Sequence, residues 1–164
     1  MKLIAAVHES YGNPCEVLNP VESEVSRPSA GQALVKLVRA SVNPSDLGMI
    51  GGSYGRLREL PAVAGREGVG EVVEVGPGVS GVKPGDIVRI PEEPGVWRQY
   101  QLCGADSLMA LPSDLPPDML AMAFINPPTA LCILEQFEDL KPGDWVIQNG
   151  AGSAVGYFMV QLCA

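Results

Sequence analysis

The chain has very few of the residues that bind metal ions or form disulfide frameworks. It contains one histidine, His8, and four widely separated cysteines among 164 residues. The cysteines are Cys15, Cys103, Cys132 and Cys163. A zinc site usually draws on several Cys and His side chains at close spacing. We therefore expect no metal site and four free thiols. His8 lies in an alternating stretch and is expected to face solvent from a strand.

Positive charge and long apolar runs are also scarce. Lys and Arg number 11 against 19 Asp and Glu, a formal net charge of −8. The clustered basic residues that bind a phosphate backbone are missing, so we expect no nucleic-acid partner. The longest apolar run, Met119 to Ile125, is far shorter than the roughly 20 residues of a membrane helix. Met1 leads into strand-like sequence rather than a signal peptide. We expect no membrane partner, and a location in the cytoplasm or an organelle matrix.

Glycine and proline, by contrast, are abundant, with 19 and 15 residues. Up to about Leu111 they separate short alternating segments, a pattern typical of a β-sandwich or β-barrel. Turn sequences such as Lys83-Pro84-Gly85-Asp86 support these boundaries. The predicted strands are Leu3–Glu9, Glu16–Val25, Gln32–Val42, Glu67–Val75, Asp86–Pro91, Trp97–Cys103 and Leu108–Leu111.

One short helix is predicted within this strand-rich part. Asn43 provides a cap, Pro44 suits the first helical position, and Asp46 places negative charge at the positive helix end. The helix is expected to end by Gly51-Gly52. Arg66-Glu67 is interpreted as a solvated pair at a strand entrance, and Trp97 as core.

After Pro112 the pattern changes, and we place a domain boundary so that residues 1–115 and 116–164 form separate domains. Helical apolar spacing predicts helices over Pro117–Ile125 and Pro128–Phe137. A buried strand over Trp145–Asn149, a glycine-rich loop and a helix over Tyr157–Cys163 follow. This order is typical of the start of a βαβ unit.

The glycine-rich loop runs from Gly150 to Gly156. Its glycines allow main-chain amides to approach a pyrophosphate, and the following helix start offers unpaired N–H groups. The spacing G-x-G-x-x-x-G departs from the strict dinucleotide fingerprint, and such loops also join strands to helices for packing reasons alone. The charged residue that would read the ribose, about 20 residues further on, would lie beyond Ala164.

Tyr54 stands in a flexible loop that can present its phenol to a ligand. A phenol can donate a proton or a hydrogen bond to a developing enolate or carbonyl oxygen. The alternative is a ring that simply covers the barrel edge. Asn43 and Thr129 have similar structural interpretations, as a helix cap and as a hydroxyl in the first turn of a helix.

Several of these segments occur in an order that resembles a known family. They are Val42-Asn43-Pro44-Ser45-Asp46-Leu47, Gly52-Ser53-Tyr54-Gly55, Leu60-Pro61-Ala62-Val63, Glu67-Gly68-Val69, Lys83-Pro84-Gly85-Asp86, Trp97-Arg98 and Asp144-Trp145-Val146-Ile147-Gln148-Asn149. The chain resembles the N-terminal half of zinc-independent medium-chain dehydrogenases/reductases, most of all mitochondrial-type trans-2-enoyl-thioester reductases and next quinone oxidoreductases. In zinc-dependent members, a Cys at the position of Asn43 and a Gly-His-Glu triplet supply metal ligands. Here Gly65-Arg66-Glu67 replaces the triplet, which agrees with an absent zinc.

The resemblance implies a GroES-like β-barrel followed by the first strand and helix of an incomplete Rossmann domain, with NADPH bound between the two. It implies an oxidoreductase of fatty acid metabolism that reduces the C=C bond of trans-2-enoyl thioesters. Tyr54 would be the catalytic acid or oxygen-orienting group, and Asn43 and Thr129 would line the nicotinamide pocket. The pyrophosphate would lie on the glycine loop, specifically on Gly150, Gly152, Ser153, Val155 and Gly156.

Because the resemblance covers about half of the family's length, we expect little reductase activity from this chain alone. Three interpretations remain open. The first is part of an enoyl-thioester reductase, and the second a quinone oxidoreductase-like NADPH reductase. The third is a non-catalytic binding or assembly domain, in which an unpaired strand at Trp145–Asn149 is covered by dimerisation or by docking of the tail. The expected partners are a small-molecule enoyl thioester or quinone, and a second copy or a missing C-terminal half.

Overall fold

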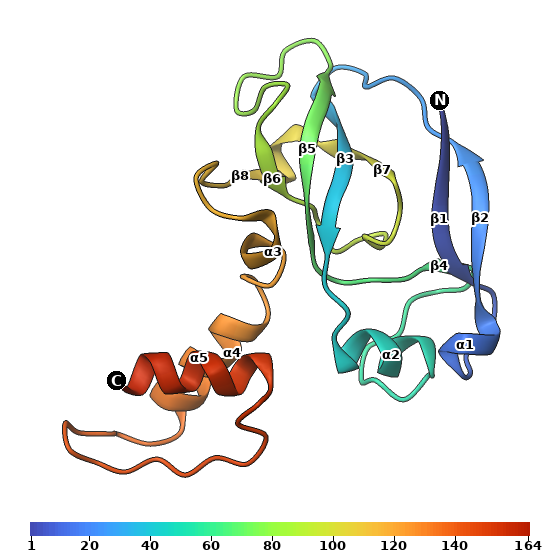
Figure 1. Ribbon diagram of the computed structural model, residues 1–164. Coiled ribbons are helices and arrows are strands. Elements are labelled where there is room, and N and C mark those ends of the chain that lie inside the picture. Colours follow the sequence, from blue (N-terminus) through green and yellow to red (C-terminus); the bar gives the residue numbers. More distant parts are fainter. The chain divides into compact units, whose positions relative to one another are not determined.

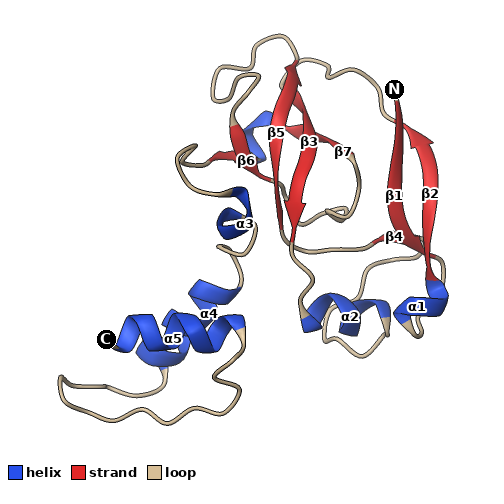
Figure 2. Ribbon diagram, in the orientation of Figure 1, coloured by secondary structure: helices blue, strands red, loops and turns tan.

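The computed structural model describes residues 1–164. The chain forms two compact units, Met1–Ala121 and Met122–Ala164, and Figure 1 colours them along the sequence. All of the strands belong to the first unit, whereas the second consists of helices and loops (Figure 2). The protein is therefore mainly β with short helices, as its sequence predicts.

Two antiparallel sheets make up most of the first unit. The smaller has the strand order β2-β1-β4 and the larger the order β7-β3-β5-β6-β8. All seven strands predicted up to Leu111 form with shifted ends, and the two-residue β4 is additional. The strands are β1 (Lys2–His8), β2 (Leu18–Glu24), β3 (Gln32–Ala40), β4 (Ala62–Val63), β5 (Gly68–Val75), β6 (Ile87–Arg89), β7 (Tyr100–Gly104) and β8 (Met109–Ala110).

The core of this unit lies on the inner face of the larger sheet. Val35 on β3 lies opposite Val72 on β5, and both are fully buried. Valine favours strands because its branched side chain packs well on a pleated surface. The core cluster consists of Ala33, Val35, Val72, Val82, Val88, Ile90, Val96 and Cys103.

The segment before β7 connects the two sheets. The main-chain N–H of Gln99 donates to the carbonyl oxygen of Ile4 on β1 at 3.0 Å. The carbonyl oxygen of Gln99 accepts from the N–H of Leu37 on β3 at 2.9 Å. One short segment thus bonds to a strand of each sheet and closes the barrel between them.

The prediction that His8 faces solvent is wrong, because the side chain is only 3% exposed. β4 pairs with β1 at Val7 and His8, and the side chain of His8 lines a small cavity together with Met49 and Ile50. The His8 Nδ1 atom lies 3.1 Å from the carbonyl oxygen of Ser10.

Helix α2 (Pro44–Ile50) follows β3 and begins where the sequence predicts. Asn43 is the N-cap residue, Pro44 occupies the first helical position, and the C-cap is Gly51. The other helices of the first unit are short. They are α1 (Pro14–Val17), the 3-10 helix η1 (Ala105–Ser107) and α3 (Pro117–Leu120). The predicted helix over Pro117–Ile125 is wrong beyond Leu120, because residues 121–125 form turns.

The second unit contains two helices that pack against each other, α4 (Asn126–Gln136) and α5 (Ala154–Cys163). Ala130 of α4 and Met159 of α5 are buried. α5 begins three residues before the predicted Tyr157, so Val155 and Gly156 lie in its first turn. No helix in either unit combines the length and apolar character that crossing a membrane requires.

The predicted strand over Trp145–Asn149 does not form. These residues are in a loop, and the side chains of Trp145 and Ile147 are 98% and 100% exposed. A strand needs neighbours that pair with its main-chain N–H and C=O groups. The second unit has no other strand to supply them.

Candidate functional site

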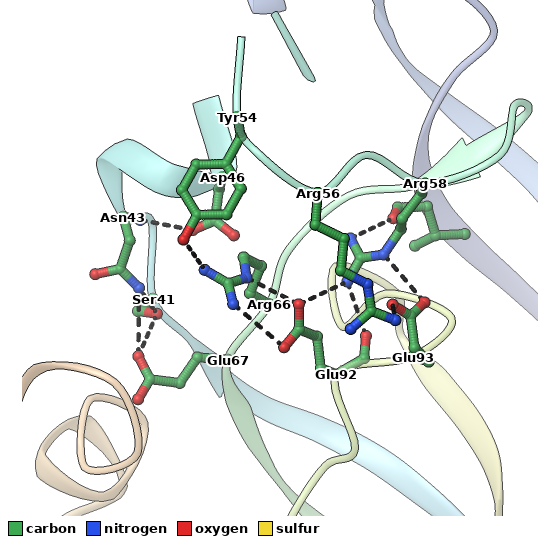
Figure 3. Close-up of polar contacts among 11 residues, drawn as sticks. Ser41, Asn43, Asp46, Tyr54, Arg56, Arg58, Arg66, Glu67, Glu92 and Glu93 are labelled. Carbon is green, nitrogen blue, oxygen red and sulfur yellow. Dashed lines mark hydrogen bonds and ion pairs between the residues drawn. The ribbon is translucent and has the colours of Figure 1, made fainter. Parts of the chain in front are cut away.

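A buried polar cluster lies at the N-terminal end of α2 (Figure 3). The Asn43 Nδ2 atom donates to Ser41 Oγ at 2.9 Å and to Glu67 Oε2 at 3.3 Å. Ser41 Oγ donates to the same carboxylate oxygen at 3.0 Å. All three residues are at most 9% exposed. Since an unpaired buried carboxylate is costly, these hydrogen bonds explain how Glu67 is accommodated there.

The ends of two paired strands bring this cluster together. Ser41 directly follows β3, and Glu67 directly precedes β5. The Ser41 N–H donates to the main-chain oxygen of Glu67 at 3.2 Å, extending the ladder between these strands. Trp97 also contacts Ser41, because its Nε1 donates to the Ser41 carbonyl oxygen at 3.1 Å. Trp97 is thus partly core, as predicted, and also a hydrogen-bond donor to the cluster.

Asp46 lies in the first turn of α2 and is 1% exposed. Its Oδ2 atom accepts from the Asn43 main-chain N–H at 2.7 Å. Burial raises the pKa of Asp46, although the hydrogen bond from Asn43 and the charge of Arg66 oppose that rise. The carboxylate therefore caps the helix, while the Asn43 side chain serves the polar cluster.

Tyr54 lies in the loop after α2 and is 39% exposed. Its main-chain N–H donates to the carbonyl oxygen of Gly48 at 3.2 Å, which ties the loop to the helix. The Tyr54 hydroxyl accepts from Arg66 Nη1 at 3.1 Å. The Arg66 Cζ atom also lies over the phenol ring, 5.1 Å from its centroid, a cation–π arrangement. The phenol is accessible, and its place is determined by one arginine.

A network of ion pairs holds that arginine. Arg66 Nε donates to Glu92 Oε1 at 2.8 Å, and Nη2 to Oε2 at 3.4 Å. Burial raises the pKa of Glu92, but the hydrogen bond and charge of Arg66, with the charges of Arg58 and Arg56, lower it overall. The hydrogen bond to Glu92 raises the pKa of Arg66. Both groups therefore stay ionised at neutral pH.

Arg58 extends the network from the Tyr54 loop. Its Nε donates to Glu93 Oε2 at 3.2 Å, and its Nη atoms donate to the carbonyl oxygens of Val63 and Glu92. Figure 3 shows Arg56, Arg58 and Arg66 directed toward the two glutamates. The interpretation of Arg66-Glu67 as a solvated pair is wrong, because the adjacent side chains point to different partners, Glu92 and the buried cluster.

The remaining residues predicted from the resemblance lie in the second unit. Thr129 is exposed in α4, and its Oγ1 donates to the Ile125 carbonyl oxygen at 2.6 Å. Ser153 caps α5, with its Oγ accepting from the Gly156 N–H at 3.1 Å. A Cβ atom at Gly156 would lie 2.6 Å from the Ala151 carbonyl oxygen. Glycine is therefore required there for packing of the loop against the helix.

The loop before α5 has room for a ligand at its other glycines. Gly150 has a positive φ of 65°, and no heavy atom lies within 4 Å of a Cβ built at Gly150 or Gly152. Main-chain N–H groups in the first turn of a helix have no partner within the helix. The Gly156 N–H already donates to Ser153 Oγ, and the Ser153 N–H donates to the Gly150 carbonyl oxygen at 2.9 Å. The N–H groups of Ala154 and Val155 are therefore the donors in the first turn that fit a pyrophosphate.

Sequence reasoning did not identify Ser41, Glu92 or the part that Arg66 and Glu67 play. A polar Ser-x-Asn pair between a strand and a helix was the one local signal for Ser41. Glu92 is 26 residues from Arg66, and no spacing rule connects them. Only the folded barrel brings them together.

Comparison with known proteins agrees with the family resemblance seen in the sequence. The family model for the alcohol dehydrogenase GroES-like domain matches residues 29–113. A mitochondrial enoyl-[acyl-carrier-protein] reductase from Bos taurus is 44% identical over 162 residues, 98% of this chain and 43% of the relative. The chain thus spans about half the length of the curated relatives that it matches.

Solved structures agree. The Etr1p complex with NADP and crotonyl-CoA superposes with a TM-score of 0.91 at 31% identity, covering 99% of this chain and 51% of that one. An Etr1p/Etr2p heterodimer from Candida tropicalis superposes with a TM-score of 0.89 at 30% identity, again covering 99% of this chain and 51% of that one. An NADPH:quinone reductase from Bacillus thuringiensis superposes with a TM-score of 0.86 at 30% identity. The match covers 99% of this chain and 49% of that one. With the matched family model covering half of its residues, this chain belongs to the alcohol dehydrogenase GroES-like domain family.

Proposed function

We propose that this chain is the N-terminal part of an NADPH-dependent reductase that reduces the C=C bond of trans-2-enoyl thioesters. The single observation that carries the proposal is the accessible Tyr54 phenol, whose oxygen is bonded to an arginine that can only donate. The similarity to enoyl reductases over nearly the whole chain supports it.

NADPH, when bound, supplies the hydride that adds to the β-carbon of the unsaturated thioester. The chain itself contributes a hydrogen-bond or proton donor for the thioester oxygen. Hydride addition places negative charge on the thioester oxygen, and a donor aimed at that oxygen stabilises the charge. Tyr54 is the proposed donor, either orienting the oxygen or passing a proton toward the enolate.

The residues present fit the cofactor. The Gly150–Gly156 loop offers an open glycine backbone and a helix start to the pyrophosphate. Among its residues, Gly150, Gly152, Ser153 and Val155 are proposed contacts, and Gly156 shapes the turn. Asn43 and Thr129 remain the proposed residues toward the nicotinamide. The proposed location is an organelle matrix, which the name of the Bos taurus relative favours over the cytoplasm.

The assay that tests the proposal compares two electron acceptors. The gene is expressed in its full reading frame, and NADPH oxidation is followed with crotonyl thioester and with a quinone. We expect the thioester to be reduced with the higher kcat/KM. A preference for the quinone would favour the quinone reductase alternative, and no turnover of either would contradict a reductase. The 164-residue chain alone is expected to show little activity.

A role in assembly is the second candidate, and the exposure of Trp145 and Ile147 favours it. Apolar side chains of this size that are exposed on a loop favour contact with a further apolar surface, in a second copy or in further sequence. Light scattering of the purified chain tests this idea. A dimer is expected, whereas a stable monomer with a readily proteolysed tail would count against assembly.

A further inference from the structure

We infer that Arg66, held by Glu92, is a positioning residue that keeps the Tyr54 hydroxyl proton free for a ligand oxygen. The inference rests on the proposed function, because it concerns the same phenol. It begins from the direction of one hydrogen bond. A guanidinium group has five N–H donors and no acceptor, so the Tyr54 oxygen must accept from Arg66 Nη1.

The phenolic proton is consequently not used in the contact with Arg66. A phenol oxygen accepts through a lone pair and keeps its own O–H for a second partner. The structure gives the Tyr54 hydroxyl no other hydrogen bond, and the residue is 39% exposed. Arg66 thus leaves the phenol as a donor toward solvent or toward a ligand at that surface.

Arg66 itself is held by two further contacts. The paired hydrogen bonds to Glu92 use Nε and Nη2, which leaves Nη1 for the phenol. Such a two-bond pair fixes the plane of a guanidinium group. The position of its Cζ atom over the Tyr54 ring then restrains the ring as well. Glu92 therefore orients Arg66, and Arg66 orients the phenol.

A simpler role would be that Arg66 only ties the Tyr54 loop to the loop that carries Glu92. Arg58 already makes that connection. Its guanidinium donates to Glu93 and to the carbonyl oxygens of Val63 and Glu92, and only 10% of its side chain is exposed. Arg66 differs from Arg58 in that its spare donor goes to the phenol oxygen.

The test uses the protein expressed in its full reading frame, with Arg66→Gln and Arg66→Lys as variants. Arg56→Gln is the matched control, because the Arg56 side chain is 80% exposed in the same network and its ion pair is with Glu93. The first readout is the ¹³Cζ NMR resonance of Tyr54 in tyrosine-labelled protein, assigned with Tyr54→Phe. The second is kcat and KM with crotonyl thioester and NADPH.

We expect Arg66→Gln to shift the Tyr54 resonance and to lower kcat about tenfold, the size of one lost hydrogen bond, with KM within about twofold. Arg66→Lys should recover part of kcat, and Arg56→Gln should match the wild type in both readouts. If Arg66→Gln does not fold, Glu92→Gln replaces it, with the same direction expected in both readouts.

The two readouts separate this inference from the proposed function. An unshifted Tyr54 resonance in Arg66→Gln, or a kcat equal to that of the wild type where Tyr54→Phe is impaired, would overturn the role of Arg66. Full activity of Tyr54→Phe would instead overturn the proposed donor. A resonance shift in Arg66→Gln would then still support the contact between Arg66 and the phenol.

Discussion

The Trp97 indole donates to the main-chain carbonyl oxygen of Ser41 at 3.1 Å, and this bond joins the barrel core to the polar cluster. Trp97 belongs to the segment that closes the barrel, and the hydroxyl of Ser41 donates to Glu67. Gly65 packs directly against the indole, so that a Cβ at this position would overlap Trp97 Cδ1. The core and the cluster are therefore expected to respond together to substitution.

A methyl group at Gly65 tests that packing. Gly65 has a φ of +85°, so Gly65→Ala adds backbone strain to the overlap with Trp97. We expect a loss of about 2–5 kcal/mol in the free energy of unfolding, measured by urea denaturation. Gly81→Ala is the control, because a Cβ there meets open space. Equal stability of the two variants would contradict the packing described.

Removing the carboxylate from the polar cluster should also be costly. Glu67→Leu leaves the buried donors of Ser41 and Asn43 without that acceptor. We expect a loss of about 1–3 kcal/mol, and a smaller one for Glu67→Gln, which keeps an acceptor oxygen. Glu71→Gln, at an exposed position of β5, should stay within about 0.5 kcal/mol of the wild type. A Glu67→Leu variant as stable as Glu71→Gln would argue against the cluster.

The buried Asp46 predicts a pH dependence of a definite sign. Because its folded-state pKa is raised above 3.8, the folded state binds a proton more tightly than the unfolded state. This group therefore makes stability fall as the pH rises from 3.8 through the raised pKa. The amide of Asp46→Asn can still accept from Asn43 but does not ionise. We expect the stability of Asp46→Asn relative to the wild type to increase across that window and then level off.

Urea denaturation of both proteins at a series of pH values measures this difference. All other titrating groups are shared, so their contributions largely cancel. A stability difference that stays constant with pH, or that falls as the pH rises, would show that burial does not control the ionisation of Asp46.

Thiol reactivity distinguishes the four cysteines. Cys103 is buried in the core, and burial raises the pKa of its thiol to about 11. The other three are exposed. At pH 8 we expect three thiols to react rapidly with a disulfide reagent and the fourth only after unfolding, since the thiolate is the reactive form. Cys103→Ala should abolish the slow phase. Four equally fast thiols would contradict the burial of Cys103.

Local signals explain why some of this structure could be predicted. The start of α2 depends on Asn43, Pro44 and Asp46, whose preferences act within a single turn. The strands likewise follow from alternation between turns. Tyr54 was expected in an accessible loop, and its exposure agrees. Whether it takes part in the chemistry remains a prediction.

The predictions that were wrong concern residues whose surroundings depend on contacts between distant parts of the sequence. The burial of His8 depends on residues far away in the sequence, because its side chain lines a small cavity together with Met49 and Ile50 of α2. The partners of Arg66 and Glu67, namely Glu92 and Ser41, lie in loops 26 residues away in the sequence. The apolar stretch at Trp145–Asn149 has strand-like residues but no neighbouring strand. Propensity is local, whereas hydrogen-bond partners are supplied by the whole fold.

The turnover of Tyr54→Phe in the protein expressed in its full reading frame tests the central claim most directly. The substitution removes one hydroxyl and leaves the ring over Arg66. If the phenol serves the thioester oxygen, kcat for NADPH-dependent reduction of crotonyl thioester should fall by about 10²-fold or more. A kcat equal to that of the wild type would contradict the account.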